Sequence, residues 1–92
     1  MAVLSSHEIT ESLKALPGWE LKNGELARRF SFSDFREAMS FVNAVADLAE
    51  TAGHHPDIDI RYNKVDLSLS SHDAGGITEK DIALAGQIAK TL

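Results

Sequence analysis

A strict alternation of apolar and polar side chains over residues 57–62, and again over residues 65–70, is the feature that most constrains the fold of this chain. The apolar positions are Ile58, Ile60, Tyr62, Val65, Leu67 and Leu69. Because successive side chains of a strand point to opposite faces, this two-residue period predicts two strands that each bury one face. Asn63-Lys64 lies between them, and we take it as the turn of an antiparallel hairpin.

The turn at Asn63-Lys64 sets a register for this hairpin. The facing pairs are then Tyr62/Val65, Arg61/Asp66, Ile60/Leu67, Asp59/Ser68 and Ile58/Leu69. Arg61 and Asp66 are most simply interpreted as a cross-strand ion pair. Carried outward, the register places His55 opposite His72, provided that Pro56 does not break the ladder.

Another hairpin is expected earlier in the chain, with strands over residues 19–22 and 25–32. Asn23-Gly24 separates the two strands and supplies the two positive φ angles of a type I′ turn. The facing pairs in this register are Lys22/Glu25 and Leu21/Leu26.

The strongest helical period covers about residues 35–52, after a cap at Ser33-Asp34. Its apolar face is expected at Phe35, Ala38, Met39, Val42, Val45, Ala46 and Ala49. Gly53 stands where a left-handed residue ends a helix, and Pro56 prevents the helix from continuing.

Two shorter helices are predicted from capping boxes. Ser5 and Glu8 start a helix over about residues 6–16, which stops at Pro17-Gly18. Thr78 and Asp81 start the last helix, after a loop at residues 73–76 that we expect to be flexible. The inner face of this helix is expected at Ile82, Ala85, Ile88, Ala89 and Leu92.

The predicted order is therefore helix, strand, strand, helix, strand, strand, helix. Because two one-sided hairpins and three one-sided helices need a common layer, we expect an α+β fold, in which three helices pack on one face of a four-stranded antiparallel sheet. At 92 residues the chain has room for a single domain, residues 1–92, and its thin core favours association with copies of itself.

Composition narrows the classes of function. The chain has no cysteine, which excludes disulfides, thiolate metal sites and a thiol nucleophile. The net charge is −5 and the basic residues are scattered, so nucleic-acid binding is disfavoured as the main role. Because the sequence shows neither a secretory signal nor an apolar run of the ~20 residues that a membrane span needs, we expect a cytoplasmic protein that does not bind membranes.

The four histidines are the main candidates for chemistry. His7 stands alone in the first turn of a helix and is most simply a surface residue, whereas His54, His55 and His72 are brought together by the hairpin. A metal site is disfavoured, because adjacent histidines in extended chain point to opposite sides and the sequence has no HExxH motif. Metal-free acid-base catalysis fits better, since imidazole both donates and accepts protons near neutral pH, as the elimination of water requires.

Several motifs then carry a resemblance to a known family. They are Glu50-Thr51-Ala52-Gly53-His54-His55-Pro56, Tyr62-Asn63-Lys64-Val65 and Leu69-Ser70-Ser71-His72, supported by Leu16-Pro17-Gly18-Trp19, Phe32-Ser33-Asp34-Phe35 and Gly76-Ile77-Thr78-Glu79-Lys80-Asp81. Together they closely resemble the signature of the pterin-4a-carbinolamine dehydratases. The resemblance spans about residues 13–89.

This resemblance implies a hydro-lyase that dehydrates 4a-hydroxytetrahydrobiopterin to the quinonoid dihydropterin, and so regenerates tetrahydrobiopterin. It implies that His54, His55 and His72 are catalytic, and we expect the first and last to transfer protons while His55 orients the substrate. The pterin is the substrate, so no cofactor and no metal are expected. The family also implies a homodimer or homotetramer.

Six further residues are predicted to contact or support the substrate: Glu50, Pro56, Ser71, Asp73, Trp19 and Asp81. Glu50 is either a partner of an imidazole or a solvated carboxylate, and the resemblance favours the first. Asp81 is evenly balanced, because capping a helix already explains it. Trp19 is either an aromatic wall for the flat pterin or simply a packed residue.

A second hypothesis is a binding or assembly module. Some members of the resembled family are dimerisation cofactors of a homeodomain transcription factor, and others assist the folding of a metabolic enzyme. Certain assembly factors have lost the histidines, whereas all three are present here, which favours the enzyme. A protein partner stays open under both hypotheses.

Overall fold

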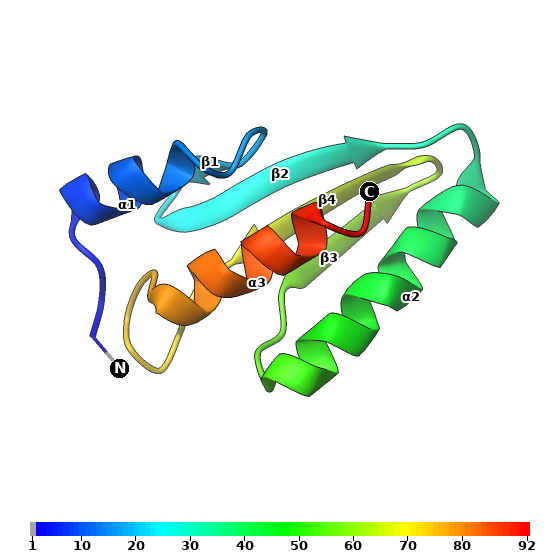
Figure 1. Ribbon diagram of the computed structural model, residues 1–92. Coiled ribbons are helices and arrows are strands. Elements are labelled where there is room, and N and C mark those ends of the chain that lie inside the picture. Colours follow the sequence, from blue (N-terminus) through cyan, green and yellow to red (C-terminus); the bar gives the residue numbers. More distant parts are fainter. Residues whose placement is uncertain (1) are drawn as a thin grey trace.

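A four-stranded antiparallel sheet in the order β1-β2-β4-β3 organises the molecule (Figure 1). The computed structural model describes residues 2–92. Its elements are α1 (Ser6–Leu13), β1 (Glu20–Lys22), β2 (Glu25–Ser31), α2 (Phe35–Ala52), β3 (Asp57–Arg61), β4 (Lys64–Leu69) and α3 (Glu79–Ala89). The predicted fold class and element order are confirmed.

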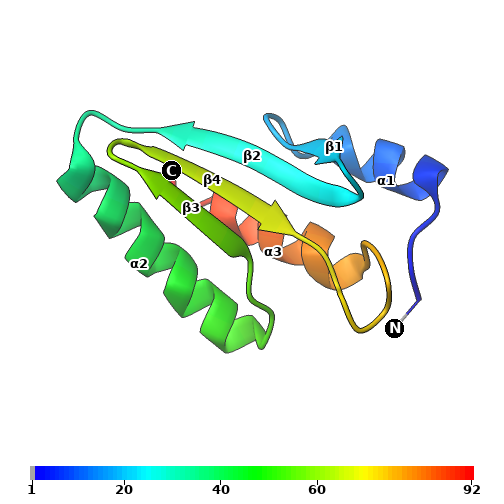
Figure 2. The same cartoon turned by 180° about the vertical axis from the view of Figure 1, so that it is seen from behind.

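The helices lie on one side of the sheet. In Figure 1, α3 lies in front of β4, and α2 runs beside α3. Seen from behind in Figure 2, β2, β4 and β3 present their other face, which no helix of residues 2–92 covers. The strands therefore separate an apolar layer beneath the helices from a polar outer face.

The core lies between the central strands and the two longer helices. Its main members are Leu26, Phe30, Val65, Leu67 and Leu69 from the sheet, and Ala38, Phe41, Val45, Leu84, Ala85 and Ile88 from the helices. Three apolar residues of β4 alternate with half-buried polar ones, as expected for a strand with one buried face. No helix within residues 2–92 is both long enough and apolar enough to span a bilayer.

The first hairpin matches its prediction. Asn23 and Gly24 have φ values of 53° and 78°, and the register pairs Lys22 with Glu25 and Leu21 with Leu26. Both strands are shorter than the predicted ranges of 19–22 and 25–32: β1 begins at Glu20, and β2 ends at Ser31.

The second hairpin turns one residue earlier than predicted. Arg61 pairs with Lys64, so the turn is Tyr62-Asn63 rather than Asn63-Lys64, and Tyr62 has a φ of 54°. The pairs are Asp57/Ser68, Ile58/Leu67, Asp59/Asp66, Ile60/Val65 and Arg61/Lys64. The predicted opposition of His55 and His72 is therefore wrong.

Contacts with β2 and its following loop explain this register. Asn63 is held in the turn because its side chain donates to the carbonyl of Phe32 (2.8 Å), and its own carbonyl accepts from the Phe32 N–H (2.9 Å). Relative to the predicted register, each residue of β3 pairs with a β4 residue two positions earlier in the chain. A shift of two positions leaves every side chain on the same face of the sheet. The alternation of apolar residues therefore does not discriminate between the two registers.

The predicted Arg61/Asp66 ion pair is also wrong. Asp66 faces Asp59 across the hairpin, and each carboxylate finds a cation elsewhere. Arg29 of β2 donates to both oxygens of Asp66 (2.8 and 2.9 Å), and this lowers the pKa of Asp66. Arg61 donates to Asp59 at 3.1 Å. A prediction made within one hairpin could not include Arg29, since it comes from a third strand.

Helix α2 has the predicted bounds, with Asp34 as its N-cap and Gly53 left-handed at its end. Its buried face is Ala38, Phe41, Val45 and Ala49, so Phe41 was missed. Phe35 and Ala46, predicted to be inside, are exposed. The apolar stripe of this helix is wider than the surface that the sheet and α3 cover, and its edges remain in solvent.

Both shorter helices begin with the predicted capping boxes. Helix α1 ends at Leu13 instead of residue 16, and residues 14–16 continue as tighter turns bonded to carbonyls three residues back. In α3, Leu84 is buried although it was not predicted, and Leu92 lies beyond the helix and is exposed. The loop at residues 73–76 is a hydrogen-bonded turn, closed by a bridge between Ser71 and Gly76.

Two glycine substitutions compare the left-handed residue that ends α2 with a glycine inside α3. Gly53→Ala places an L-residue at φ 62° and should lower the free energy of unfolding by about 1 kcal/mol, because the added Cβ meets no neighbour and only the backbone is penalised. Gly86→Ala lies inside α3, where its Cβ would be 3.9 Å from Leu16, and should raise that energy by about 0.5–1 kcal/mol. Urea unfolding measures both, and a stabilised Gly53→Ala variant would contradict this account.

Candidate active site

A pocket of about 500 Å³ opens at the end of the sheet where β4 finishes. The connector between α2 and β3, the segment after β4 and the start of α3 meet there. The lining residues are Gly53, His54, His55, Ser70, Ser71, His72, Asp73, Ala74, Thr78 and Lys80. The three predicted catalytic histidines thus surround one cavity, although the register that first brought them together is not the one observed.

His54 is the most buried of the three histidines, and a buried carboxylate holds it. Its Nε2 lies 2.5 Å from Oδ1 of Asp81, and the two side chains are 13% and 0% exposed. A carboxylate only accepts hydrogen bonds, so Nε2 carries the proton in this contact. In the neutral ring this leaves Nδ1 as the nitrogen with a free lone pair.

The other oxygen of Asp81 closes a hydrogen-bond network. Its Oδ2 accepts from Ser71 Oγ and from the N–H of Thr78, each at 2.9 Å. Because Ser71 gives its proton to Asp81, Thr78 Oγ1 must donate in the 2.8 Å contact with Ser71 Oγ. The Thr78 hydroxyl in turn accepts from the N–H of Lys80 at 3.3 Å.

Asp81 therefore does both things that the sequence left open. It completes the capping box of α3, and it orients His54 at the pocket. Both of its oxygens are bonded, which offsets the cost of burying the carboxylate.

His55 is paired more openly. Its Nε2 lies 2.5 Å from Oε2 of Glu50, with side-chain exposures of 63% and 76%. Glu50 is in the last turn of α2, so the capped end of that helix brings the carboxylate to the ring. The structure therefore supports the interpretation of Glu50 as a partner of an imidazole.

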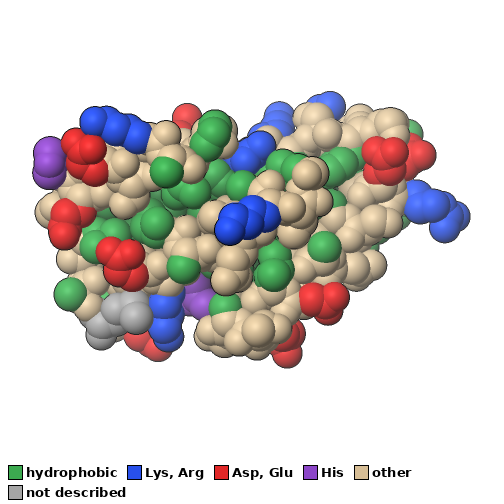
Figure 3. Space-filling view, viewed as in Figure 1, with side chains coloured by type: hydrophobic (Ala, Val, Ile, Leu, Met, Phe, Trp, Pro, Cys, Tyr) green, Lys and Arg blue, Asp and Glu red, His purple; other side chains and the backbone are tan. Residues whose placement is uncertain are grey.

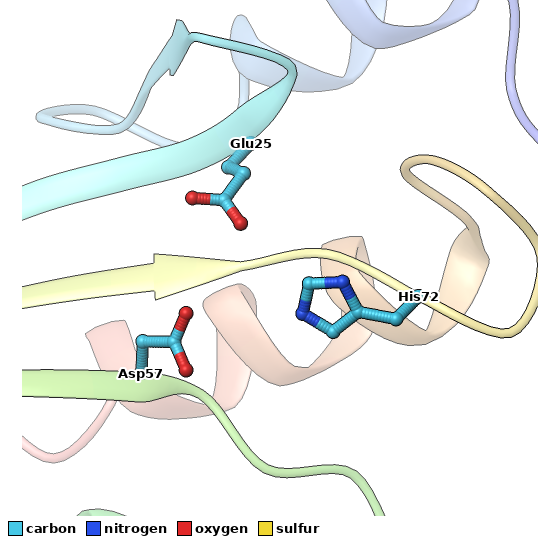
Figure 4. A group of neighbouring side chains, drawn as sticks. All are labelled: Glu25, Asp57 and His72. Carbon is cyan, nitrogen blue, oxygen red and sulfur yellow. The ribbon is translucent and has the colours of Figure 1, made fainter.

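His72 lies beside two carboxylates from different strands (Figure 4). Glu25 begins β2 and Asp57 begins β3, and their oxygens and a ring nitrogen of His72 all lie within 4.8 Å of one another. These side chains are of the types that bind metal ions, and two of the three are exposed. Neither carboxylate was predicted, because each is an ordinary strand residue in the sequence.

The remaining predicted residues divide into two groups. Ser71 and Asp73 line the pocket, whereas Pro56 is half-buried in the connector beside it. Trp19 is 5% exposed and packs edge-on against Phe30, with ring centroids 6.0 Å apart. The structure therefore places Trp19 in the core and not among the pocket-lining residues.

Ser70, Thr78 and Lys80 line the pocket without having been predicted there. All three lie inside the quoted motifs, next to residues that were predicted, so the motifs were a signal for each of them. On the face shown in Figure 3, Lys and Arg side chains are spread among Asp and Glu, and a histidine lies in a hollow below α3.

Chemically, the pocket offers three imidazoles that differ in environment. His54 is largely buried beside a fully bonded carboxylate, His55 is exposed beside the exposed Glu50, and His72 is exposed beside the exposed Asp57 and the half-buried Glu25. Such an arrangement can deliver a proton at one point of a bound ring and remove one at another.

Comparisons with known proteins point to one family. Residues 2–91 match the family model described as pterin 4 alpha carbinolamine dehydratase. A relative from Thermomicrobium roseum, provisionally named pterin-4-alpha-carbinolamine dehydratase, is 57% identical over 90 residues. The match covers 98% of this chain and 97% of that protein.

Solved structures agree with this fold. A crystal structure from Brucella melitensis, described as a transcriptional coactivator/pterin dehydratase, is 37% identical with a TM-score of 0.92 and covers 96% of both chains. A pterin dehydratase-like protein identified as a RuBisCO assembly factor in the alpha-carboxysome is 27% identical with a TM-score of 0.64. That match covers 78% of this chain and 83% of the other.

Asp81→Asn tests whether this carboxylate orients His54. The amide has only one acceptor oxygen, so it cannot serve Ser71, Thr78 and His54 as the carboxylate does, and we expect the free energy of unfolding to fall by about 1–3 kcal/mol. The ¹⁵N shifts of His54 should also show the loss of its Nε2–H contact. Glu79→Gln, an exposed neighbour in the same helical turn, is the control. Equal losses in the two variants would contradict the role given to Asp81.

Proposed function

This chain belongs to the pterin 4 alpha carbinolamine dehydratase family, and we propose that it dehydrates 4a-hydroxytetrahydrobiopterin to the quinonoid dihydropterin. The observation that carries the proposal is the convergence of His54, His55 and His72 on one pocket, each with a carboxylate nearby. In an organism that hydroxylates aromatic amino acids with tetrahydrobiopterin, the reaction would return the spent cofactor toward its reduced form.

The chemistry of this dehydration needs one acid and one base. The C4a–O bond breaks and the hydroxyl leaves as water after it takes a proton from the enzyme. The proton on N5 passes to a base, and the electron pair of that N–H bond forms the C4a=N5 double bond. No electron is gained or lost overall, so the reaction as written requires no redox cofactor. A positioned ring and two imidazoles are sufficient for both proton transfers.

We assign proton transfer to His54 and His72, and substrate orientation to His55. The contact of His54 with Asp81 favours the tautomer whose Nδ1 can accept a proton, and its burial keeps the ring in one place. His72 comes from a different segment, at the end of β4, which suits a second group acting elsewhere on the substrate. His55 and Glu50 form an exposed pair that can bind a polar edge of the pterin.

Ser71 and Asp73 extend this assignment to binding. Both line the pocket, and pterin edges carry several hydrogen-bond donors and acceptors. Asp73 is exposed and free to contact a substrate, whereas the Ser71 hydroxyl is already engaged with Asp81 and Thr78. We therefore expect Asp73 to affect substrate binding more directly than Ser71.

The alternative function is a binding or assembly role. Two structural relatives are described as a coactivator/dehydratase and as a RuBisCO assembly factor, so a protein partner is the second candidate for this chain. Such a role does not require the three histidines and their carboxylates, and their presence favours the enzyme.

Histidine substitutions test the proposed reaction. His54→Ala and His72→Ala should each lower the rate of carbinolamine dehydration by about 100-fold or more, as the loss of a general acid or base does. His7→Ala is the matched control, because His7 is an exposed residue of α1 outside the pocket lining. The measurement follows dehydration of synthetic carbinolamine, with circular dichroism to verify folding.

Unchanged dehydration in both variants would rule out this mechanism. A purified protein without dehydratase activity that binds another protein stoichiometrically would instead establish the assembly role.

A further inference from the structure

Two carboxylates, one from each of the strands that flank β4 in the sheet, converge on His72. Glu25 in β2 and Asp57 in β3 flank the end of β4, from which the chain continues to His72 (Figure 4). In the register of the sheet, Leu26 pairs with Leu69 and Asp57 with Ser68, so both acids belong to the outer face, opposite the buried leucines. The ring of His72 turns back toward the space between them.

Ser70 connects one of these carboxylates to the ring. Its hydroxyl donates to Oε2 of Glu25 at 3.2 Å, and its Oγ lies 3.5 Å from Nε2 of His72. A hydroxyl can donate only one hydrogen bond, and Ser70 donates it to Glu25. In the contact with His72, the Ser70 oxygen therefore accepts from the imidazole. Glu25, Ser70 and His72 thus form a chain of two contacts. The carboxylate orients the hydroxyl, and the hydroxyl orients the ring.

This arrangement differs from that of the other two histidines. His54 and His55 contact their carboxylates directly at 2.5 Å, whereas His72 reaches Glu25 through a hydroxyl and a long contact. Because His72 is exposed and held only by this long contact, the orientation of its ring depends on Ser70 and on the carboxylate that orients Ser70. The two negative charges also attract the ring when it is protonated, which is the form that can give a proton to a leaving hydroxyl.

We propose that Glu25 is a positioning residue for His72 and acts through Ser70, with Asp57 contributing a second negative charge from the opposite strand. The inference rests on the proposed dehydration. It concerns how His72 is held for that reaction, and neither Glu25 nor Asp57 contacts the substrate in this assignment.

A structural role for the same contact has to be separated from a positioning role. Glu25 comes just before Leu26 and Ser70 just after Leu69, the pair that ends the β2–β4 ladder, so their hydrogen bond could serve only to hold the strand ends together. A purely structural contact affects stability, and its loss lowers the rate by the same factor whether or not His72 is present. A positioning contact affects the rate only while His72 is there to be positioned.

A double-mutant cycle distinguishes the two roles. Glu25→Gln keeps the size of the side chain and removes its charge, and it should lower kcat about 5-fold while KM changes by less than about 2-fold. In the His72→Ala background the same substitution should have almost no further effect. Ser70→Ala should lower kcat to a similar extent, and combining it with Glu25→Gln should add little. Glu20→Gln, an exposed carboxylate on β1, is the matched control and should leave kcat unchanged.

Equal losses from Glu25→Gln in the wild-type and His72→Ala backgrounds would overturn the proposal, and so would an unchanged kcat in Glu25→Gln. The ¹⁵N shifts of the His72 imidazole give a readout that does not depend on activity. They should change in both Glu25→Gln and Ser70→Ala, while those of His7 should not, and unchanged His72 shifts would also overturn the inference. If His72→Ala alone leaves the rate intact, the proposed catalytic role of His72 fails, and the NMR result still decides whether Glu25 holds the ring.

Discussion

The buried carboxylate of Asp81 is the interaction on which the site depends. It joins three segments that are distant in sequence: His54 from the connector after α2, Ser71 from the segment after β4, and the first turn of α3. A fully buried charge is tolerated only when its oxygens are bonded, and here both are. The same requirement that stabilises the start of α3 therefore fixes one wall of the pocket.

The three histidines have different environments, one largely buried and two exposed. His54 is held tightly by Asp81, His55 pairs with Glu50 in solvent, and His72 is held through Ser70 beside two strand carboxylates. Each carboxylate comes from a different element, so the geometry of the site requires the sheet, α2 and α3 to be assembled together. This explains how a chain of 92 residues builds three different environments around similar side chains.

Local signals predicted the elements well. The bounds of α2, both capping boxes and the Asn23-Gly24 turn were correct, because each depends on residues a few positions apart in the chain. Predictions that involved a third element were less accurate. Phe41 and Leu84 are buried and Phe35 is exposed, since the neighbouring layer decides which part of an apolar stripe is covered.

By itself, the sequence determined the element order, the one-sided sheet and the identity of the three clustered histidines. The tertiary structure decided the register of the second hairpin, the contact of Asp81 with His54 and the two carboxylates beside His72. A shift of two positions leaves the pattern of faces unchanged, so alternation cannot select the turn, whereas the contacts of Asn63 with Phe32 can. Likewise, no spacing in the chain indicates that Glu25 and Asp57 meet at His72, because strand order in the sheet brings them together.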